Sequence, residues 1–556
     1  MRPEFHHMAK TENWRKSSAA RIRMYRHGLG DCFLLTFPTS PKSSNRGRDF
    51  QVLIDCGDIR DTGKPDQNIG LVVQNLIDQL KEDETETLGN DVNDPPILDV
   101  VVATHEHWDH LSAFASFQEK FEEIQVQEVW MAWTEKPGDP IANGLRTERA
   151  AKVKQLRVGI QAVRSHLAAS GALNADASAG AAADDYHRVA EVLSFFGYDS
   201  LTGNALGAAG GKRLGIVDAM NWCRNGCQPE PTDQPSTTPR FFKPEEVIDL
   251  TNFVSGLNAL VLGPPTDRKQ LFKDLPTKKG RETYEEEEKD EEEKKKKKVH
   301  AISQAFFGAD VGLGAETSRD ALKRSTPFDP KYRIQPEEAE GIDFFQDHYF
   351  GTGPDDRESW RRIDGNGLEG AAEFALRLDS DTNNTSLALA FALEDGRVLL
   401  FPGDAQVGNW ESWHKDETGA NRSWKVGDRT WTAAEVLKET VVYKVGHHGS
   451  HNATLRALGL ELMEHKELIA LVPVDRYVAH KVKRWPQMPF DPLITRLEEK
   501  TKGRVVFADE AASAELKRRF PGPLVDAEEK ITVTTEAKEN DERPLYVNYF
   551  LPKKSP

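Results

Sequence analysis

Three histidines and one aspartate lie within one short loop, directly after an apolar run that is typical of a buried β-strand. The run covers residues 98–103, and the loop carries His105, His107, Asp109 and His110. Side chains that leave one loop at a strand tip can reach two metal ions, and imidazole and carboxylate are ligands for zinc, manganese and iron. Neutral histidines packed this densely gain nothing from burial without a metal. The loop therefore predicts a metal site.

Later segments place more side chains of the same chemical types at the ends of predicted strands. One strand tip alone is a weak signal, because a strand followed by Gly-Asp is usually a turn. Four strand tips that carry Asp, His-x-His-x-Asp-His, Asp and His-His in this order are a strong joint signal. The further residues are Asp55, Asp404, His447 and His448.

Apolar runs bounded by turn residues predict two groups of strands, each followed by helices. This pattern indicates an α/β fold in which one sheet packs on another with helices outside. Strands are expected at 22–25, 32–37, 50–55, 98–103, 127–133, 258–263, 374–378, 386–393, 397–401, 441–445 and 468–474, and helices at 67–82, 432–440 and 492–500.

Shifts in composition divide the chain into core segments and insertions. Glutamate and lysine runs at 285–298 predict a solvated or disordered insertion without a catalytic role. The long insertions replace short loops near the site, so we expect them to form its walls or lid. The expected segments are a flexible tail (1–18), the first half of the core (19–136), a mostly helical insertion (137–250), a core strand (251–266), a charged and irregular insertion (267–370), and the second half of the core with C-terminal elements (371–556).

Net charge and cysteine content limit the class of protein. A net charge of −17 argues against coating duplex nucleic acid through a basic face, although bound cations could still invert the field at a hydrolytic site. Four cysteines in 556 residues suggest a reducing compartment. No apolar run is long enough for a membrane span or a signal peptide, so we expect a cytoplasmic protein without a membrane partner. The sequence does not indicate the oligomeric state.

The order of these segments resembles the metallo-β-lactamase superfamily, and the local motifs are similar to those of its ComEC-type branch. The resemblance covers about 20–135, 255–265 and 372–510, and it implies a four-layer αββα sandwich with a dinuclear site at one edge of the two sheets. The matching segments are 28–31, 53–57, 104–110, 261–265, 383–387, 400–404 and 444–450.

The resemblance also implies a role for each matching residue. His105 and His107 would hold one ion, and Asp404 would bridge to a second ion held by Asp109, His110 and one histidine of the 447–448 pair. We favour His447 as that ligand because it leaves the strand first, which would leave His448 to contact substrate or donate a proton. Asp55 and Asn384 would support the ligands. Ser450 and His451 would contact substrate or merely cap the next helix.

One position departs from the family pattern. Many members have a further histidine ligand to the first ion just before the strand that leads to the bridging aspartate. Here that place holds Asn383 and Asn384, as in the ComEC-type branch. Four other histidines could substitute, although each is more simply an ordinary histidine. They are His166, His187, His300 and His348.

These features predict a metal-dependent hydrolase in which two divalent ions, zinc or manganese, activate water. Asp109 or His448 would carry the proton. The resemblance favours a phosphodiester substrate, which includes nucleic acid. One alternative is a hydrolase of a lactone, thioester or other carboxyl-derived molecule. A second alternative is a metal-binding interaction module without catalysis.

Overall fold

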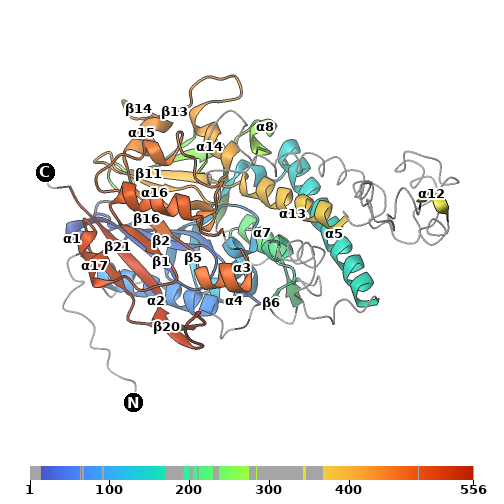
Figure 1. Ribbon diagram of the computed structural model, residues 1–556. Coiled ribbons are helices and arrows are strands. Elements are labelled where there is room, and N and C mark those ends of the chain that lie inside the picture. The colour runs from blue at the N-terminus through green and yellow to red at the C-terminus, as the bar shows by residue number, and fades with distance from the viewer. Residues whose placement is uncertain are drawn as a thin grey trace, which may run out of the picture.

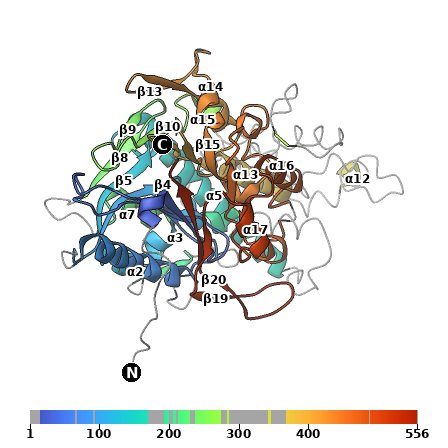
Figure 2. The same ribbon diagram turned by 90° about the vertical axis from the view of Figure 1, so that its left-hand side faces the viewer.

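The computed structural model of the chain is an α/β protein with two large sheets and helices outside them (Figures 1 and 2). The α/β class expected from the sequence is thereby confirmed. All structural statements refer to the described residues, which are 14–62, 64, 68–89, 93–169, 192–199, 205–209, 212–228, 237–273, 283–284, 342–345, 367–485 and 487–554.

The first sheet has eight strands and changes from antiparallel to parallel pairing at β3. The carboxyl ends of β3, β4 and β5 therefore lie at one edge of the sheet. In sheet order its strands are β18 (Leu524–Asp526), β21 (Tyr546–Pro552), β1 (Ser18–Tyr25), β2 (Cys32–Phe37), β3 (Phe50–Cys56), β4 (Ile97–Ala103), β5 (Gln125–Ala132) and β8 (Thr238–Phe242).

The second sheet has seven strands and changes in the same way at β12. Its strands β12, β15 and β16 run parallel, so their carboxyl ends also lie together. In sheet order its strands are β17 (Val505–Phe507), β16 (Ile469–Val472), β15 (Thr440–Lys444), β12 (Val398–Phe401), β11 (Ala388–Ala392), β10 (Asn258–Gly263) and β9 (Val247–Asp249).

The two sheets pack face to face over a continuous apolar core. Phe33 on β2 meets Phe401 on β12 at 5.6 Å between ring centroids, and Phe37 meets Phe391 at 6.1 Å. Each fully buried aromatic or aliphatic side chain stabilises the fold by about 1.5–3 kcal/mol. This shared core fixes the position of one sheet relative to the other.

Helices cover the outer face of each sheet (Figure 2). Helix α2 buries Ile69, Val72, Val73, Leu76 and Leu80, and this 3–4 residue spacing is the helical period read from the sequence. Helices α2 (Asn68–Leu88), α3 (Trp108–Ser116) and α4 (Gln118–Phe121) cover the first sheet, and α14 (Val407–His414), α15 (Ala433–Lys438) and α16 (Asp491–Thr501) cover the second.

The insertion 137–250 is helical in much of its described part, and it lies against the histidine loop. Its α7 (Ile216–Arg224) packs on α3, and α5 (Pro140–Ala169) contacts α13 (Gly367–Asn383), as Figure 1 shows. The last part of this insertion was expected to be mostly helical, but it contains two strands. β8 pairs with β5 in the first sheet, and β9 pairs with β10 in the second. Pro239 hides the strand pattern of β8, and it is tolerated because β8 lies at a sheet edge.

Helix α13 replaces the strand predicted at 374–378. Its buried residues include Ala375, Leu378, Asp379, Thr382 and Asn383, whereas Leu376 is exposed. This spacing of three and four residues is that of one face of a helix rather than one face of a strand. The prediction was wrong because a short apolar run does not distinguish the two periods.

Several short elements complete the described chain. Trp14 packs on Phe550, so the end of the predicted tail 1–18 is ordered, while 1–13 lies outside the described residues. Most of the insertion 267–370 also lies outside them, but Tyr284 is buried and donates to Glu461 at 2.9 Å. The elements are α1 (Trp14–Ser17), β6 (Gly207–Ala209), β7 (Lys212–Leu214), α8 (Arg268–Leu271), α12 (Asp343–Phe345), β13 (Ser423–Val426), β14 (Arg429–Thr432), α17 (Ala514–Arg519), β19 (Lys530–Val533) and β20 (Asp541–Pro544).

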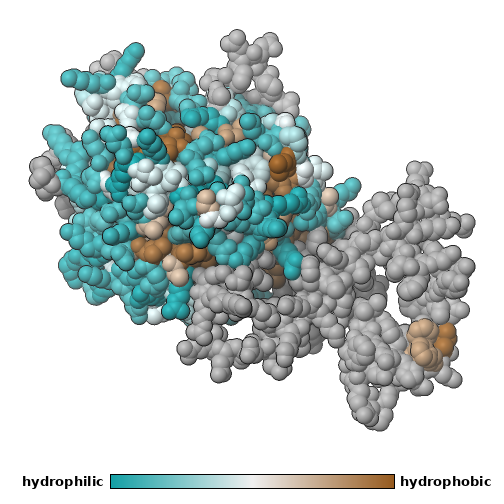
Figure 3. Space-filling model, turned by 90° about the horizontal axis from the view of Figure 1, so that it is seen from above, coloured by the Kyte–Doolittle hydropathy of each residue, from teal (hydrophilic) through white to brown (hydrophobic). Residues whose placement is uncertain are grey.

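The described surface seen from above is mostly hydrophilic, with separate smaller apolar patches (Figure 3). Among the described helices, none combines the length and the apolar character that a membrane crossing requires.

Candidate metal centre

The histidine loop connects β4 to α3 and is held at its start by Asp55. Asp55 accepts hydrogen bonds from the backbone N–H of Thr104 at 2.9 Å and from its Oγ1 at 2.7 Å. The same carboxylate lies 2.8 Å from Nδ1 of His110. Asp55 has φ 54°, a left-handed conformation that is unfavourable for a residue other than glycine. The predicted supporting role of Asp55 thus corresponds to three short contacts in the structure.

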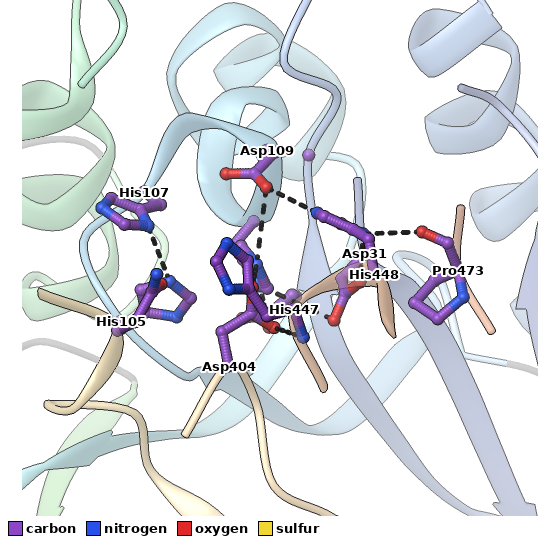
Figure 4. A network of polar contacts seen from close by, with 12 residues as sticks. Asp31, His105, His107, Asp109, Asp404, His447, His448 and Pro473 are labelled. Carbon is purple, nitrogen blue, oxygen red and sulfur yellow. Dashed lines mark hydrogen bonds and ion pairs between the residues drawn. The ribbon is translucent and has the colours of Figure 1, made fainter. Parts of the chain in front are cut away.

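Four buried side chains from three chain segments form the centre of the site (Figure 4). Nε2 of His448 lies 2.9 Å from Oδ2 of Asp109, and Nε2 of His110 lies 3.2 Å from Oδ2 of Asp404. One ligand-type atom from each residue lies within 4.8 Å of the others. The edges of both sheets therefore contribute to one cluster that could hold a metal ion.

The buried polar atoms of this cluster fit a metal ion. Within the described part of the chain, Oδ1 of Asp109 is buried without a hydrogen-bond partner, and Nε2 of His110 and Oδ2 of Asp404 make no hydrogen bond but form an ion pair with each other at 3.2 Å. Buried polar atoms are normally paired, because an unpaired one loses its hydration without compensation. These atoms are nitrogen and oxygen donors that a divalent ion would satisfy.

The segment that follows β15 determines which of two adjacent histidines joins the cluster. His447 and His448 have φ of 45° and 52°, so both lie in the left-handed region. Nδ1 of His448 donates to the carbonyl of Pro473 at 2.7 Å, which directs Nε2 toward Asp109. The structure therefore places His448 among the candidate ligands, whereas the sequence favoured His447.

His447 lies beside the cluster and contributes its backbone to it. Its N–H donates to Oδ1 of Asp404 at 2.8 Å. Its ring nitrogen Nδ1 is buried and has no hydrogen-bond partner among the described residues. The order of the two histidines in the sequence could not reveal this, because the left-handed turn reverses which ring points inward.

His105 and His107 form a second pair of candidate ligands. Nε2 of His105 and Nδ1 of His107 face each other at 3.0 Å, within hydrogen-bond distance, so the two nitrogens point to one place where an ion could take them as ligands. Rings of the insertion cover this pair. The centroids of Phe195 and Phe196 lie 5.3 and 5.1 Å from that of His107.

Ion pairs also attach the insertion to the loop. Arg149 on α5 lies 3.3 Å from the carboxylate of Glu106 and 3.1 Å from that of Glu135. Arg224 on α7 pairs with the second oxygen of Glu135. The insertion therefore forms a wall of the site on this side, as expected from its position in the sequence.

Two buried residues that the sequence analysis left without a role lie behind the cluster. Nζ of Lys444 donates to Oδ1 of Asp404 at 2.9 Å and to the carbonyl of Gly403 at 2.9 Å, and it pairs with Asp31. Asp31 also belongs to a second group of candidate ligand atoms with Asp55 and His110. Both residues lie in segments that carry the family resemblance, at 28–31 and 444–450. That resemblance was the sequence feature from which a role for them could have been predicted.

Carboxylates raise the pKa of the two histidines in the cluster. Burial opposes the charged ring, but Asp404, Asp31 and Asp109 raise the pKa of His110 well above its usual value. Burial also opposes protonation of His448, yet its hydrogen bond to Asp109 raises its pKa. Metal binding would release these protons, because imidazole coordinates in its neutral form.

The remaining histidines of the site are neutral at physiological pH. Burial, with the neighbouring His110, lowers the pKa of His105 well below its usual value. Burial lowers the pKa of His107 to about 3 and that of His447 to about 4. His105 and His107 therefore already have the protonation state that coordination requires.

Three other predicted residues lie around the site rather than in it. Asn384 accepts from the backbone N–H groups of Gln406 and Asn409, which orders the turn after Asp404. Ser450 donates to Asn452 at 3.1 Å. His451 is exposed, and its ring lies 6.0 Å from that of Phe490.

Asp379 on α13 is a buried carboxylate that sequence reasoning missed. Its Oδ1 lies 3.7 Å from Nε2 of His107. Burial and the nearby Asp109 and Asp404 raise the pKa of Asp379 well above its usual value. The signal was the helical spacing of 375, 378, 379 and 382, which the predicted strand obscured.

The geometry thus combines a four-residue cluster, a histidine pair and a supporting shell of Asp31, Asp55 and Lys444. The side chains of the four histidines named as possible substitutes for a further ligand are not among those described; they are His166, His187, His300 and His348.

In comparisons with known proteins, no family model and no curated protein sequence matches the chain.

Proposed function

We propose that the chain is a metal-dependent hydrolase of the metallo-β-lactamase superfamily, most similar to its ComEC-type branch. The motif order supports this assignment, and so do two packed sheets with helices outside, which is the arrangement expected of an αββα sandwich. Two divalent ions, zinc or manganese, would bind at the shared edge of the sheets.

One observation carries the proposal. The buried side chains of Asp109, His110, Asp404 and His448 converge so that one ligand-type atom of each lies within 4.8 Å of the others, and Oδ1 of Asp109 has no hydrogen-bond partner in the described part of the chain. A purely structural cluster would be expected to pair its carboxylates with arginine or lysine. In this cluster the carboxylates pair mainly with histidines instead: Lys444 binds Oδ1 of Asp404, whose Oδ2 lies 3.2 Å from Nε2 of His110.

The residues of the site have distinct tasks in hydrolysis. Asp109, His110, Asp404 and His448 would hold one ion, and His105 with His107 would hold the other. Bound ions supply a water of lowered pKa and positive charge for an oxyanion. Asp109 has two carboxylate oxygens, so one would bind the ion while the other takes the proton of the attacking water. Neutral His447, whose Nδ1 is unpaired among the described residues, is the candidate to carry a proton, in place of the expected His448.

We propose a phosphodiester as the substrate, including one within a nucleic acid. The site mixes carboxylate and imidazole ligands, a set that suits manganese or zinc, and both ions stabilise negative charge on phosphoryl oxygen. With a net charge of −17, attraction for an anionic substrate would come from the ions rather than from the overall field.

The first experiment measures ions and activity on the same preparation. Metal analysis after reconstitution should find about two ions per chain. Bis-p-nitrophenyl phosphate and single-stranded DNA should be hydrolysed with Mn²⁺ or Zn²⁺, and Asp109→Ala should lower the rate at least about 100-fold. Glu119→Ala, a change at an exposed carboxylate in the neighbouring helix α4, is the control and should retain ions and activity.

Other outcomes would point to the alternative functions. Hydrolysis of a lactone or thioester, without hydrolysis of either phosphodiester, would replace the proposed substrate class. A folded chain that takes up no metal would contradict the hydrolase assignment altogether. Two bound ions without any hydrolysis would favour the interaction module.

A further inference from the structure

Two unpaired buried atoms face each other behind the histidine pair. Nε2 of His107 and Oδ1 of Asp379 lie 3.7 Å apart, and their side chains are 1% and 9% exposed. Neither atom has a hydrogen-bond partner within the described part of the chain. Burial of an unpaired carboxylate oxygen destabilises a fold, so this position calls for a functional explanation.

The surrounding contacts aim Asp379 at the histidine. Asp379 lies on the inward face of α13, next to the buried Leu378. Asn383, one turn further along the helix, donates from Nδ2 to Oδ2 of Asp379 at 3.2 Å. That hydrogen bond holds one carboxylate oxygen away from the site and leaves the other directed at His107.

An ion bound by the histidine pair would determine the tautomer of His107. Nδ1 of His107 faces Nε2 of His105 at 3.0 Å, so these two nitrogens are the ones available to a shared ion. A neutral imidazole that coordinates through Nδ1 carries its proton on Nε2. The proton of His107 would therefore point at Oδ1 of Asp379.

We propose that Asp379 is the positioning residue of the ion site at His105 and His107. It would accept the Nε2–H of His107, fix the ring with Nδ1 toward the ion, and increase the basicity of that nitrogen. This arrangement strengthens an ion site at which Asn383 and Asn384 occupy the place of the further histidine. The inference rests on the proposed function, because it assumes that an ion binds at this pair.

The test compares metal affinities of full-length variants. Zn²⁺ is titrated into the metal-free protein against a chelating dye, which resolves a tighter and a weaker site. Loss of a carboxylate that orients a ligand histidine weakens metal binding about 10- to 100-fold. Asp379→Ala should show this loss at one site and leave the other unchanged.

Two further variants make the result specific. Asp379→Asn keeps the size and one acceptor oxygen but removes the charge, so its affinity should lie between those of the wild type and Asp379→Ala. Asp381→Asn is the matched control, because it lies two residues further along α13 and its carboxylate lies 3.4 Å from Lys152 instead of a histidine. It should bind both ions as the wild type does.

A second readout separates positioning from a structural role. In ¹⁵N-histidine-labelled, zinc-loaded protein, the His107 ring should be protonated at Nε2, and Asp379→Ala should change that signal. The thermal midpoint of the metal-free variant should fall little, because only the hydrogen bond from Asn383 to Oδ2 is lost and the unpaired Oδ1 is removed with it. A lower midpoint with unchanged zinc affinity would assign Asp379 a structural role and overturn the inference.

The outcomes also distinguish this inference from the proposed function. A wild-type chain that binds fewer than two ions contradicts the proposed dinuclear site before any variant is considered. A wild type with two ions, and an Asp379→Ala variant with unchanged affinity at both sites, overturns the role of Asp379 alone. If Asp379→Ala does not fold, the Asn variant decides, because wild-type affinity there would exclude a need for the negative charge.

Discussion

A buried aspartate lies near each end of β4, and the two aspartates differ in their hydrogen-bond partners. At the amino end, Asp99 accepts from Nη1 and Nη2 of Arg48 at 3.0 and 2.5 Å and from the backbone N–H of Gln51 at 2.8 Å. Beyond the carboxyl end, Asp109 contacts His448 through Oδ2, while its Oδ1 has no hydrogen-bond partner among the described residues. The same residue type thus has different surroundings in the strand and in the first turn of α3, the helix that follows it.

The difference separates stability from chemistry. A buried carboxylate with a bidentate arginine contributes to the fold, and its partner depends on it. A buried carboxylate with an unpaired oxygen lowers the free energy of unfolding, and residues that do so are commonly found at functional sites. Asp55, His447 and His448 at the carboxyl edge also have positive φ, which is unfavourable for residues other than glycine, although such residues occur elsewhere in the described chain as well.

The largest expected effect on stability lies at the amino end. Asp99→Ala leaves the guanidinium of Arg48 buried without its carboxylate, and breaking such a pair costs about 3–5 kcal/mol. The loss is measured by urea unfolding of the metal-free protein, and zinc affinity of the folded variant should be unchanged. If Asp99→Ala and Asp109→Ala lowered the free energy of unfolding of the metal-free protein equally, the distinction between the two ends of β4 would be lost.

A smaller effect is expected at the carboxyl end, and it depends on metal. Zinc at about 100 times its dissociation constant should stabilise the wild type by about 2.7 kcal/mol, because the ion binds only the folded chain. Asp109→Ala should lose this increment at the four-residue cluster, in addition to the stability that its contact with His448 gives the metal-free protein. The measurement is urea unfolding with and without zinc, and an equal gain in the variant would contradict the assignment.

The smallest effect is a dependence on pH. Carboxylates raise the pKa of His110 and His448 in the folded chain. The protonated rings therefore stabilise the metal-free fold fully below the pKa of histidine in the unfolded chain, about 6.5, and this stabilisation is lost as the pH rises through the raised pKa values of the folded chain. Metal binding displaces these protons, so zinc affinity should rise with pH by up to about tenfold per unit for each proton. Opposite pH trends of the metal-free and metal-loaded proteins, measured by thermal unfolding, are expected; parallel trends would contradict this.

Much of the architecture could be predicted from local patterns. Strands such as β3, β4, β11 and β15 are short apolar runs bounded by turn residues, and the structure confirms them close to their predicted ends. The failures have physical causes. The pattern of β8 is broken by Pro239, and α13 contains an apolar run too short to separate the helical from the strand period.

The candidate site was partly predictable for a related reason. Strand-end motifs are contiguous in sequence, so they identified Asp109, His110 and Asp404. The choice between His447 and His448 depends on a left-handed turn that the residue types do not encode. Asp379 is contributed by a helix that no motif marks, so only the three-dimensional structure brings it to His107.

The metal centre proposed at the carboxyl edge of the two sheets can be observed in crystals of the zinc-loaded protein by anomalous diffraction at the zinc absorption edge. We expect one peak among Asp109, His110, Asp404 and His448 and a second beside His105 and His107. Crystals with no peak at this edge, and with Oδ1 of Asp109 and Oδ2 of Asp404 paired to protein groups instead, would contradict it.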